Sequence, residues 1–324
     1  MNIDLLDPAK VDLGELAWLA HVAFKGVTGT SHFSALTAEL QNAEHYWRKY
    51  HAAAGRARIA AVRENGNLLA MNAMVPVALR SGSGTALGWQ SCDTATHPDA
   101  RGRGLFMACL KALKEQLADG DIFFGYPNAN SMPGLTKFGW GKRAVLDAYV
   151  ALLPGISDEP GIRQIDRFDS HFDPFARSLV SAGSVCIERS AAYLNWRYFS
   201  SPQSPYAALV YDMGAGLEGY AVVRAVSSGA RRVCIVMEVF GATLDVERTL
   251  LRAATGWARR ARAWPTVMFT NRWGDRTWLR HGWMRLPRRL SPRQLVLMGS
   301  GVGQAGQQVF DLDWRAFVGD WDVF

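Results

Sequence analysis

The first half of the chain alternates short apolar runs with segments of helical spacing. Residues 87–96 form an apolar, threonine-containing run of strand character that ends at His97-Pro98-Asp99. Downstream, Leu105, Cys109, Leu113 and Leu117 recur at helical intervals. Further strands are predicted over residues 121–126 and 144–153, and residues 12–60 are expected to be helical. The pattern is that of an α/β unit.

The second half repeats this order. Strands are predicted over residues 206–211, 219–226 and 232–239, then a helix over 245–262, a strand over 266–270 and a short helix ending at 279–283. Residues 154–161 between the halves are rich in proline and glycine. We therefore predict an α/β fold with mixed sheets of the α+β kind. It is built from two tandem domains, residues 1–155 and 186–324, with residues 156–185 as a linker.

Composition agrees with a well-packed soluble protein. The chain has 324 residues, of which 49% are hydrophobic and 20% charged. Its acidic N-terminus does not resemble a signal peptide, and no apolar run is long enough to span a membrane. The four cysteines have neither pairing nor metal-ligand spacing. We expect a cytoplasmic protein with reduced thiols and no metal.

The most informative segment is Arg101-Gly102-Arg103-Gly104, which joins a predicted strand to a predicted helix. Glycines allow a tight turn and close approach to a ligand. The first N–H groups of the helix have no partner within it, and they lie at the positive end of the helix dipole. Such a turn binds phosphate, and two arginines strengthen it. The spacing matches neither a P-loop nor a dinucleotide fingerprint.

This segment, followed by the Asn128-led stretch that ends Lys137-Phe138-Gly139-Trp140, resembles the GNAT (Gcn5-related) N-acetyltransferase superfamily. The resemblance extends over about residues 67–147 and implies an acyl-CoA-dependent transferase. In this reading the CoA pyrophosphate lies on the loop and helix start, and the pantetheine arm runs along a splayed strand edge. The residues implied in CoA binding are Thr94, Ala95, Thr96, Arg101, Gly102, Arg103, Gly104, Leu105, Phe106 and Asn128.

Two positions depart from the family pattern. Phe106 stands where the family prefers glycine or alanine. A bulky residue can still supply its backbone N–H, so we expect phosphate binding to survive with altered packing around it. Leu135 stands where many members carry a tyrosine that protonates the departing thiolate, and leucine has no proton to donate. Ser131 and Tyr126 are the alternative donors, unless the thiolate leaves unprotonated. Asn128 either orders the pantetheine arm or a water, or is a turn residue.

Asp93 is the candidate general base, because it is a single charge in an otherwise uncharged strand beside the expected acyl site. Burial would raise its pKa toward a useful range. The alternatives are an ion pair with Arg101 or Arg103, or water as the proton acceptor. Cys92 is expected to be a small core residue rather than a nucleophile.

The second domain is not expected to bind CoA. It has Gly241 to Glu247 where the first has Arg-Gly-Arg-Gly, and acids at a helix start oppose phosphate binding. Ahead of it, Trp196-Arg197 resembles a pair found in tandem GNAT proteins similar to sugar N-acyltransferases of polysaccharide clusters. The arginine would clasp an anion and the tryptophan would stack on a ring. The alternative is that Trp196 anchors an interdomain helix and Arg197 is exposed.

The resemblance implies an N-acyltransferase in which an amine attacks the thioester directly, in a ternary complex. The net charge is +7, and residues 248–293 hold twelve arginines against one acid, Asp275. This charge favours an anionic partner or is simply a solvated face. A nucleotide-linked amino sugar is the expected acceptor. The alternatives are a transferase resembling the Fem peptidoglycan enzymes, which would use aminoacyl-tRNA, and a CoA-binding protein without catalysis.

Overall fold

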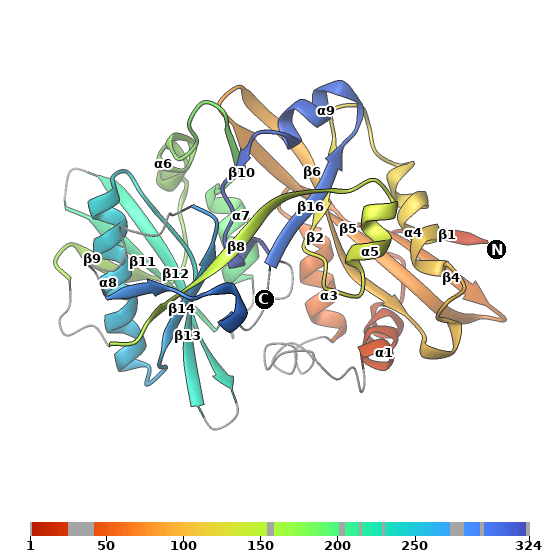
Figure 1. Ribbon diagram of the computed structural model, residues 1–324, viewed down its shortest axis with the longest axis horizontal. Coiled ribbons are helices and arrows are strands. Elements are labelled where there is room, and N and C mark those ends of the chain that lie inside the picture. The colour runs from red at the N-terminus through yellow and green to blue at the C-terminus, as the bar shows by residue number, and fades with distance from the viewer. Residues whose placement is uncertain are drawn as a thin grey trace.

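The computed structural model describes residues 2–24, 42–153, 159–200, 205–213, 216–228, 231–272, 282–291 and 295–321. Its main element is one large, mostly antiparallel sheet that runs through both halves of the chain, with helices packed on its faces (Figure 1). The strand order is β1-β4-β5-β6-β7-β16-β8-β14-β13-β12-β11-β9. The predicted mixed α/β fold is confirmed.

The first half contributes the N-terminal lobe. Its elements are β1 (Ile3–Leu6), α1 (Leu13–Phe24), α3 (Ala43–Tyr50), β2 (His51–Ala52), β3 (Gly55–Arg56), β4 (Arg58–Glu64), β5 (Asn67–Ser81), β6 (Gly84–Thr96), α4 (Leu105–Lys114), β7 (Ile122–Gly125), α5 (Met132–Lys137) and β8 (Gly141–Ala151). The helical expectation for residues 12–60 is met by α1 and α3, falls outside the described residues at 25–41, and was wrong after residue 50. There Ile59, Ala60 and Ala61 are fully buried in a strand between β1 and β5.

The second half has the predicted succession of strands. Its elements are β9 (Ile162–Ile165), α6 (Asp173–Ser178), β10 (Ser184–Ile187), α7 (Ala191–Phe199), β11 (Tyr206–Asp212), β12 (Leu217–Ser228), β13 (Arg231–Gly241), α8 (Leu244–Arg260), β14 (Thr266–Thr270), β15 (Trp283–Arg285), β16 (Leu295–Gly301), α9 (Gly303–Phe310) and β17 (Asp313–Trp314). The predicted short helix before residue 283 lies outside the described residues, as does most of the turn at 154–161.

The two halves exchange strands. β16, near the end of the chain, lies between β7 and β8 and pairs antiparallel with both. β8 pairs with β16 through residues 141–146 and continues into the second half, where residues 147–151 pair with β14. In Figure 1, β8 crosses the centre of the molecule from one lobe to the other. Hydrogen bonds between strands therefore connect the two predicted domains. The division into residues 1–155 and 186–324 stays a prediction.

Three apolar clusters form the core. One lies beneath α1 and α3 and includes Leu16, Tyr50 and Cys92. A second lies beneath α4 and α5, on the opposite face of the N-terminal sheet. The third fills the second half and extends into the first through Val77, Leu79, Ile122 and Phe124. This shared core and the exchanged strands join the two halves firmly.

Candidate functional site

The loop before α4 has the backbone that the sequence predicts. Gly102 and Gly104 have φ angles of 76° and 75°, in the left-handed region that favours glycine. A Cβ atom built on either residue would meet nothing within 4 Å. The glycines are therefore required by the turn itself, and the space above them is open to a ligand.

The loop leads directly into the N-terminus of α4, where Gly104 is the cap residue and makes no side-chain capping bond. The N–H groups of the first turn point out of the helix toward the space above the loop. Phe106 packs against α5, since a Cβ on Gly134 would lie 3.1 Å from its ring. The bulky residue at this position is accommodated by helix packing, and its backbone N–H stays in the first turn.

The two loop arginines bind groups of the N-terminal lobe. The Arg101 guanidinium donates to the carbonyl oxygen of Ala23 at 2.6 Å, at the end of α1. Arg103 forms a two-point ion pair with Glu64, at 3.0 and 3.1 Å. The alternative that either arginine pairs with Asp93 was wrong. Both arginines are exposed, and they flank the loop.

Strands β6 and β7 run parallel and then separate. They pair at Gly88–Ile122, Trp89–Phe123 and Gln90–Phe124. Beyond Gln90, among the described residues, β6 is paired only with β5 on its other side. Thr94, Ala95 and Thr96 lie on this separated part of β6. The splayed strand edge expected from the sequence is therefore present, and it opens toward the loop before α4.

The separated part of β6 contains a β-bulge. The register is Ala73↔Cys92 and Met71↔Ala95. Asn72 alone therefore faces two residues, Asp93 and Thr94. Asn72 is fully buried, and its amide nitrogen donates to the Thr94 hydroxyl oxygen at 3.0 Å. Asp93 has a φ of 48°, unusual for a residue other than glycine.

The carboxylate of Asp93 is bound by α3. Lys49 Nζ lies 2.9 Å from Oδ1 and 2.8 Å from Oδ2, and the Tyr50 hydroxyl donates to Oδ2 at 3.0 Å. Burial, the largest single influence, would raise the pKa of Asp93, but the Lys49 ammonium, with His45 and the Tyr50 hydroxyl, holds that pKa below its usual value. The expected rise was therefore wrong. Lys49 and Tyr50 were missed because they lie more than 40 residues away in sequence.

Asn128 and Ser131 form a turn before α5. The Asn128 side-chain oxygen accepts from the N–H groups of Asn130 and Ser131, at 2.9 and 3.0 Å. The Ser131 hydroxyl lies 3.2 Å from the same oxygen. Leu135 is buried in the core beneath α4 and α5, and Tyr126 is also buried. The turn interpretation of Asn128 accounts for these contacts, and its role toward CoA stays a prediction.

Trp196 and Arg197 join α7 to other parts of the molecule. The Trp196 indole donates to the carbonyl oxygen of Arg48 in α3 at 2.8 Å. Arg197 donates to the carbonyl oxygens of Gly319 and Trp321, at 3.0 and 2.8 Å. These contacts favour the interpretation of the pair as an anchor between lobes. Substrate binding by these residues stays a prediction.

The equivalent region of the second half is built differently. β13 and β14 pair at residues 234–236 and 266–268, and the C-terminal segment 313–321 lies against the ends of both strands. The Thr270 hydroxyl donates to the Ala316 carbonyl at 2.8 Å, and Ala316 N–H donates to Asn271. The start of α8 is capped by Thr243, whose hydroxyl accepts from the N–H of Val246.

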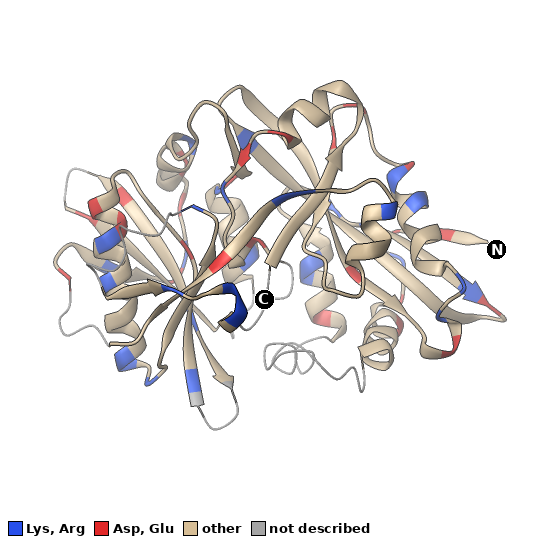
Figure 2. Ribbon diagram, in the orientation of Figure 1, with Lys and Arg blue, Asp and Glu red and all other residues tan. Residues whose placement is uncertain are grey.

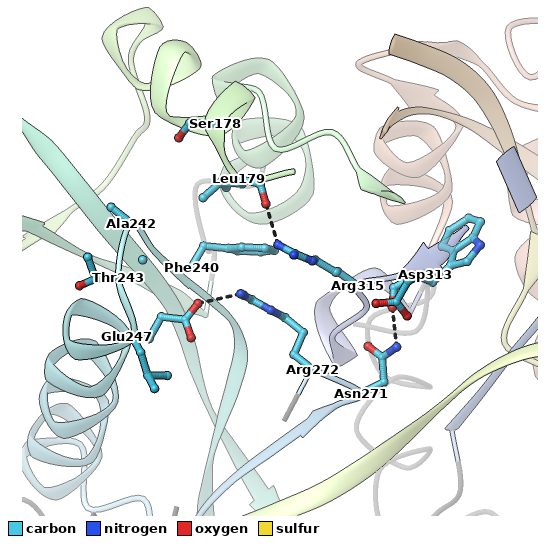
Figure 3. A pocket seen from close by; sticks show the side chains of 13 residues that line it. Ser178, Leu179, Phe240, Ala242, Thr243, Glu247, Asn271, Arg272, Asp313 and Arg315 are labelled. Carbon is cyan, nitrogen blue, oxygen red and sulfur yellow. Dashed lines mark hydrogen bonds and ion pairs between the residues drawn. The ribbon is translucent and has the colours of Figure 1, made fainter. Parts of the chain in front are cut away.

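A pocket of about 610 Å³ lies beside the start of α8 (Figure 3). Its Arg272 pairs with Glu247 at 2.9 Å, and its Arg315 donates to the Leu179 carbonyl at 3.0 Å. Two acids, Glu247 and Asp313, balance the two arginines of the lining. The lining therefore has no excess of positive charge, and the expectation that this half does not bind CoA stays a prediction.

Five of the nine arginines that the structure describes in residues 248–293 form ion pairs with acids from outside that segment. Ion pairs join Arg248 to Asp245, Arg252 to Glu159, Arg272 to Glu247, and both Arg285 and Arg288 to Asp147. Figure 2 shows the acidic positions of α8 at its start and basic positions further along the helix. The basic excess seen in the sequence is therefore reduced in the fold.

The described residues contain no candidate site for metal or thiol chemistry. No group of three or more His, Cys, Asp or Glu side chains there could hold a metal ion. All four cysteines are buried, and burial raises the pKa of Cys109 and Cys234 to about 12. No helix among the described residues is long and apolar enough to cross a membrane.

Comparison with known proteins agrees with this geometry. Residues 21–143 match the family model of the acetyltransferase (GNAT) domain. No curated protein sequence matches the chain. Since the family match covers the loop, the splayed strand and α5, it includes every element of the site in the first half.

Solved structures show the same fold over nearly the whole chain. A protein of Enterococcus faecalis V583, described as a probable N-acyltransferase, has a TM-score of 0.62 at 13% identity, covering 95% of this chain and 73% of its own. A GCN5-related N-acetyltransferase from Anabaena variabilis has a TM-score of 0.63 at 11% identity, covering 92% and 72%. One from Kribbella flavida has 0.56 at 10% identity, covering 92% and 70%. At this low identity the likeness shows a shared fold, and the match to the GNAT acetyltransferase domain itself extends over residues 21–143.

Proposed function

We propose that this protein transfers an acyl group from acyl-CoA to a primary amine. The observation that carries the proposal is the open loop at Gly102 and Gly104, placed at the start of α4 and next to the separated end of β6. Backbone N–H groups at a helix N-terminus suit a pyrophosphate. An unpaired strand edge suits the amide groups of a pantetheine arm.

In this proposal the N–H groups of residues 101–106 hold the pyrophosphate, with Arg101 and Arg103 beside it. Thr94, Ala95 and Thr96 present their backbone to the pantetheine arm. The absence of any atom within 4 Å of a Cβ at Gly102 or Gly104 supports the fit, because a phosphate needs that space. A backbone N–H near Thr94 would then polarise the acyl carbonyl.

The acceptor amine attacks the thioester directly, without an acyl-enzyme. Because Lys49 holds Asp93 ionised with a low pKa, Asp93 is a weak base, and we assign proton removal to water. Leu135 offers no proton to the departing thiolate. Asn128 and the Ser131 hydroxyl stand at the start of α5, and Ser131 is our proposed donor.

A nucleotide-linked amino sugar remains our proposed acceptor, on the sequence resemblance alone. The alternative of an aminoacyl-tRNA-dependent transferase rested on the arginine-rich segment, where five arginines are paired with acids, and such an enzyme has no need of the loop at Gly102 and Gly104. Thermal-shift measurements with acetyl-CoA, longer acyl-CoAs and nucleotide-linked amino sugars test the substrates. A ligand at 100 times its Kd adds about 2.7 kcal/mol of stability.

The decisive variant is Gly104→Glu, which places a carboxylate where the pyrophosphate would lie. We expect acetyl-CoA affinity, measured by calorimetry, to fall about 100-fold or more, equal to about 2.8 kcal/mol. The matched control is Gly183→Glu. Gly183 is exposed, has a φ of 81° and likewise has nothing within 4 Å of a Cβ, so the backbone strain is the same. Equal affinity in the two folded variants would contradict the proposal.

A further inference from the structure

Asp93 adopts a backbone conformation that is uncommon for any residue other than glycine. Its φ of 48° lies in the left-handed region, in the middle of strand β6. In bulges of this kind the left-handed position is usually occupied by glycine. Holding another residue there is unfavourable, so neighbouring contacts must maintain it.

The contacts that maintain it come from one helix. Lys49 and Tyr50 are adjacent residues at the end of α3, and both bind the Asp93 carboxylate. The pair is enclosed, because the Lys49 and Asp93 side chains are only 10% and 6% exposed. Tyr50 is fully buried. Since water competes little there, these bonds fix the carboxylate firmly.

The carboxylate is thereby held on the α3 side of the sheet. Its neighbours Cys92 and Ala95 belong to the core beneath α1 and α3. Thr94 instead bonds to Asn72, whose side-chain oxygen also accepts from the Ser91 hydroxyl at 3.1 Å. The bulge is therefore clamped by the α3 residues through Asp93 and by Asn72 through Thr94.

A bulge leaves backbone groups outside the regular ladder. Here it lies where β6 has separated from β7, on the open side expected to receive the acyl group. A donor that stabilises charge on a reacting carbonyl must be fixed in direction before the reaction. The orientation of the N–H groups at residues 93–94 depends on the bulge, and the bulge depends on Asp93.

We propose that Asp93 is a positioning residue rather than a base: tied to Lys49 and Tyr50, it holds the bulge so that a backbone N–H at residues 93–94 points at the acyl carbonyl. This inference rests on the proposed function. It assigns α3 a part in the reaction, since the helix sets the direction of the donor without touching the thioester.

The test compares variants that remove the carboxylate with and without removing the anchor. In the double variant Lys49→Gln/Asp93→Asn the amide groups can still hydrogen-bond, and Asn tolerates the left-handed conformation. Asp93→Ala loses both anchor and conformation. The readout is the infrared stretching frequency of the carbonyl in bound acetyl-CoA labelled with ¹³C, together with kcat and the Kd for CoA.

We expect the bound carbonyl frequency to be lowered in the wild type and in the double variant. The lowering should be lost in Asp93→Ala, with a fall in kcat of about 100-fold, as when one oxyanion donor is removed. The Kd for CoA should be unchanged, because the loop before α4 is intact. Should Asp93→Ala not fold, Asp93→Gly serves instead, since glycine adopts the conformation freely but lacks the anchor.

Two results would overturn the inference. If the double variant loses as much activity as Asp93→Ala while the carbonyl frequency stays lowered in both, Asp93 acts as a base. If Asp93→Gly keeps the full lowering, the anchor is not needed. A wild-type protein that does not bind acetyl-CoA at all would instead contradict the proposed function.

Discussion

His45 lies close to the Asp93–Lys49 pair and has a strongly altered pKa. Burial lowers the pKa of its imidazole from 6.5 to about 4, and the nearby Lys49 ammonium lowers it further than Asp93 raises it. The imidazole is therefore neutral in the folded protein at neutral pH. Because the unfolded chain binds a proton at higher pH than the folded one, folding stability must depend on pH in this range.

We predict that the free energy of unfolding falls as the pH is lowered from 6.5 to 4, and that His45→Gln reduces this fall by about 1 to 3 kcal/mol. Above pH 6.5 the imidazole is neutral in both the folded and the unfolded chain, so the full stability is retained there. Denaturant unfolding of wild type and variant at several pH values measures it. His171→Gln is the control, since the His171 side chain is 95% exposed. Parallel pH profiles for wild type and His45→Gln would contradict the prediction.

At the scale of residues, features that are determined by adjacent residues in the sequence could be predicted. Gly102 and Gly104 were identified because a turn before a helix needs them. Asp93 was singled out correctly as a charge in an apolar strand, but its partner was not, because Lys49 reaches it only through packing of α3 on the sheet. A long-range ion pair leaves no local periodic signal.

The exchange of β8 and β16 is the main feature at the scale of elements. β16 is inserted between β7 and β8, and it depends on close approach at one glycine. A Cβ at Gly299 would lie 2.5 Å from the Phe123 carbonyl oxygen of β7. Its partner in the β8 ladder is Gly141, where a Cβ would meet nothing within 4 Å. Of these two paired glycines, Gly141 has room for a side chain and Gly299 does not.

We predict that Gly299→Ala destabilises the protein by about 1 to 3 kcal/mol, because β7 and β16 must move apart to admit the methyl group. Gly141→Ala should change stability by much less. Thermal unfolding of the two variants, side by side, measures the difference. Equal melting temperatures would show that β16 does not pack on β7 as described.

The strand succession of each half was predictable from apolar runs, but the exchange was not. Strand β14 occupies the predicted residues 266–270, and β6 and β13 contain their predicted runs. The exchange joins residues about 150 positions apart, such as Leu146 and Leu295. Alternation along a strand identifies it as a strand without identifying its partner, so the position of β16 in the sheet required the structure.

At the scale of the whole molecule, a buried polar network joins the C-terminal segment to both halves. Arg189 is fully buried, and it pairs with Asp320 of the C-terminal segment and lies 3.1 Å from Glu238 of β13. The hydroxyls of Tyr198 and Tyr220 donate to the same Glu238. This network holds the C-terminal segment against β13. The backbone oxygen of Asp320 in turn accepts from Gln90 of β6 at 2.7 Å.

We therefore predict one acyl-CoA site per chain. The segment 313–321 lies at the splayed ends of β13 and β14, and the start of α8 carries acids and its own cap. Calorimetric titration with acetyl-CoA should give a stoichiometry of one, abolished by Gly104→Glu. A second site that survives Gly104→Glu would show that the second half binds CoA as well.

The place of β16 near the end of the chain also sets an order for synthesis and folding. Until residues 295–301 have been synthesised, the edges of β7 and β8 that pair with β16 in the folded protein lack that partner. Contacts between distant parts of a chain form slowly, and open strand edges aggregate. These edges are therefore a place where aggregation can begin during folding, and where a chaperone can bind.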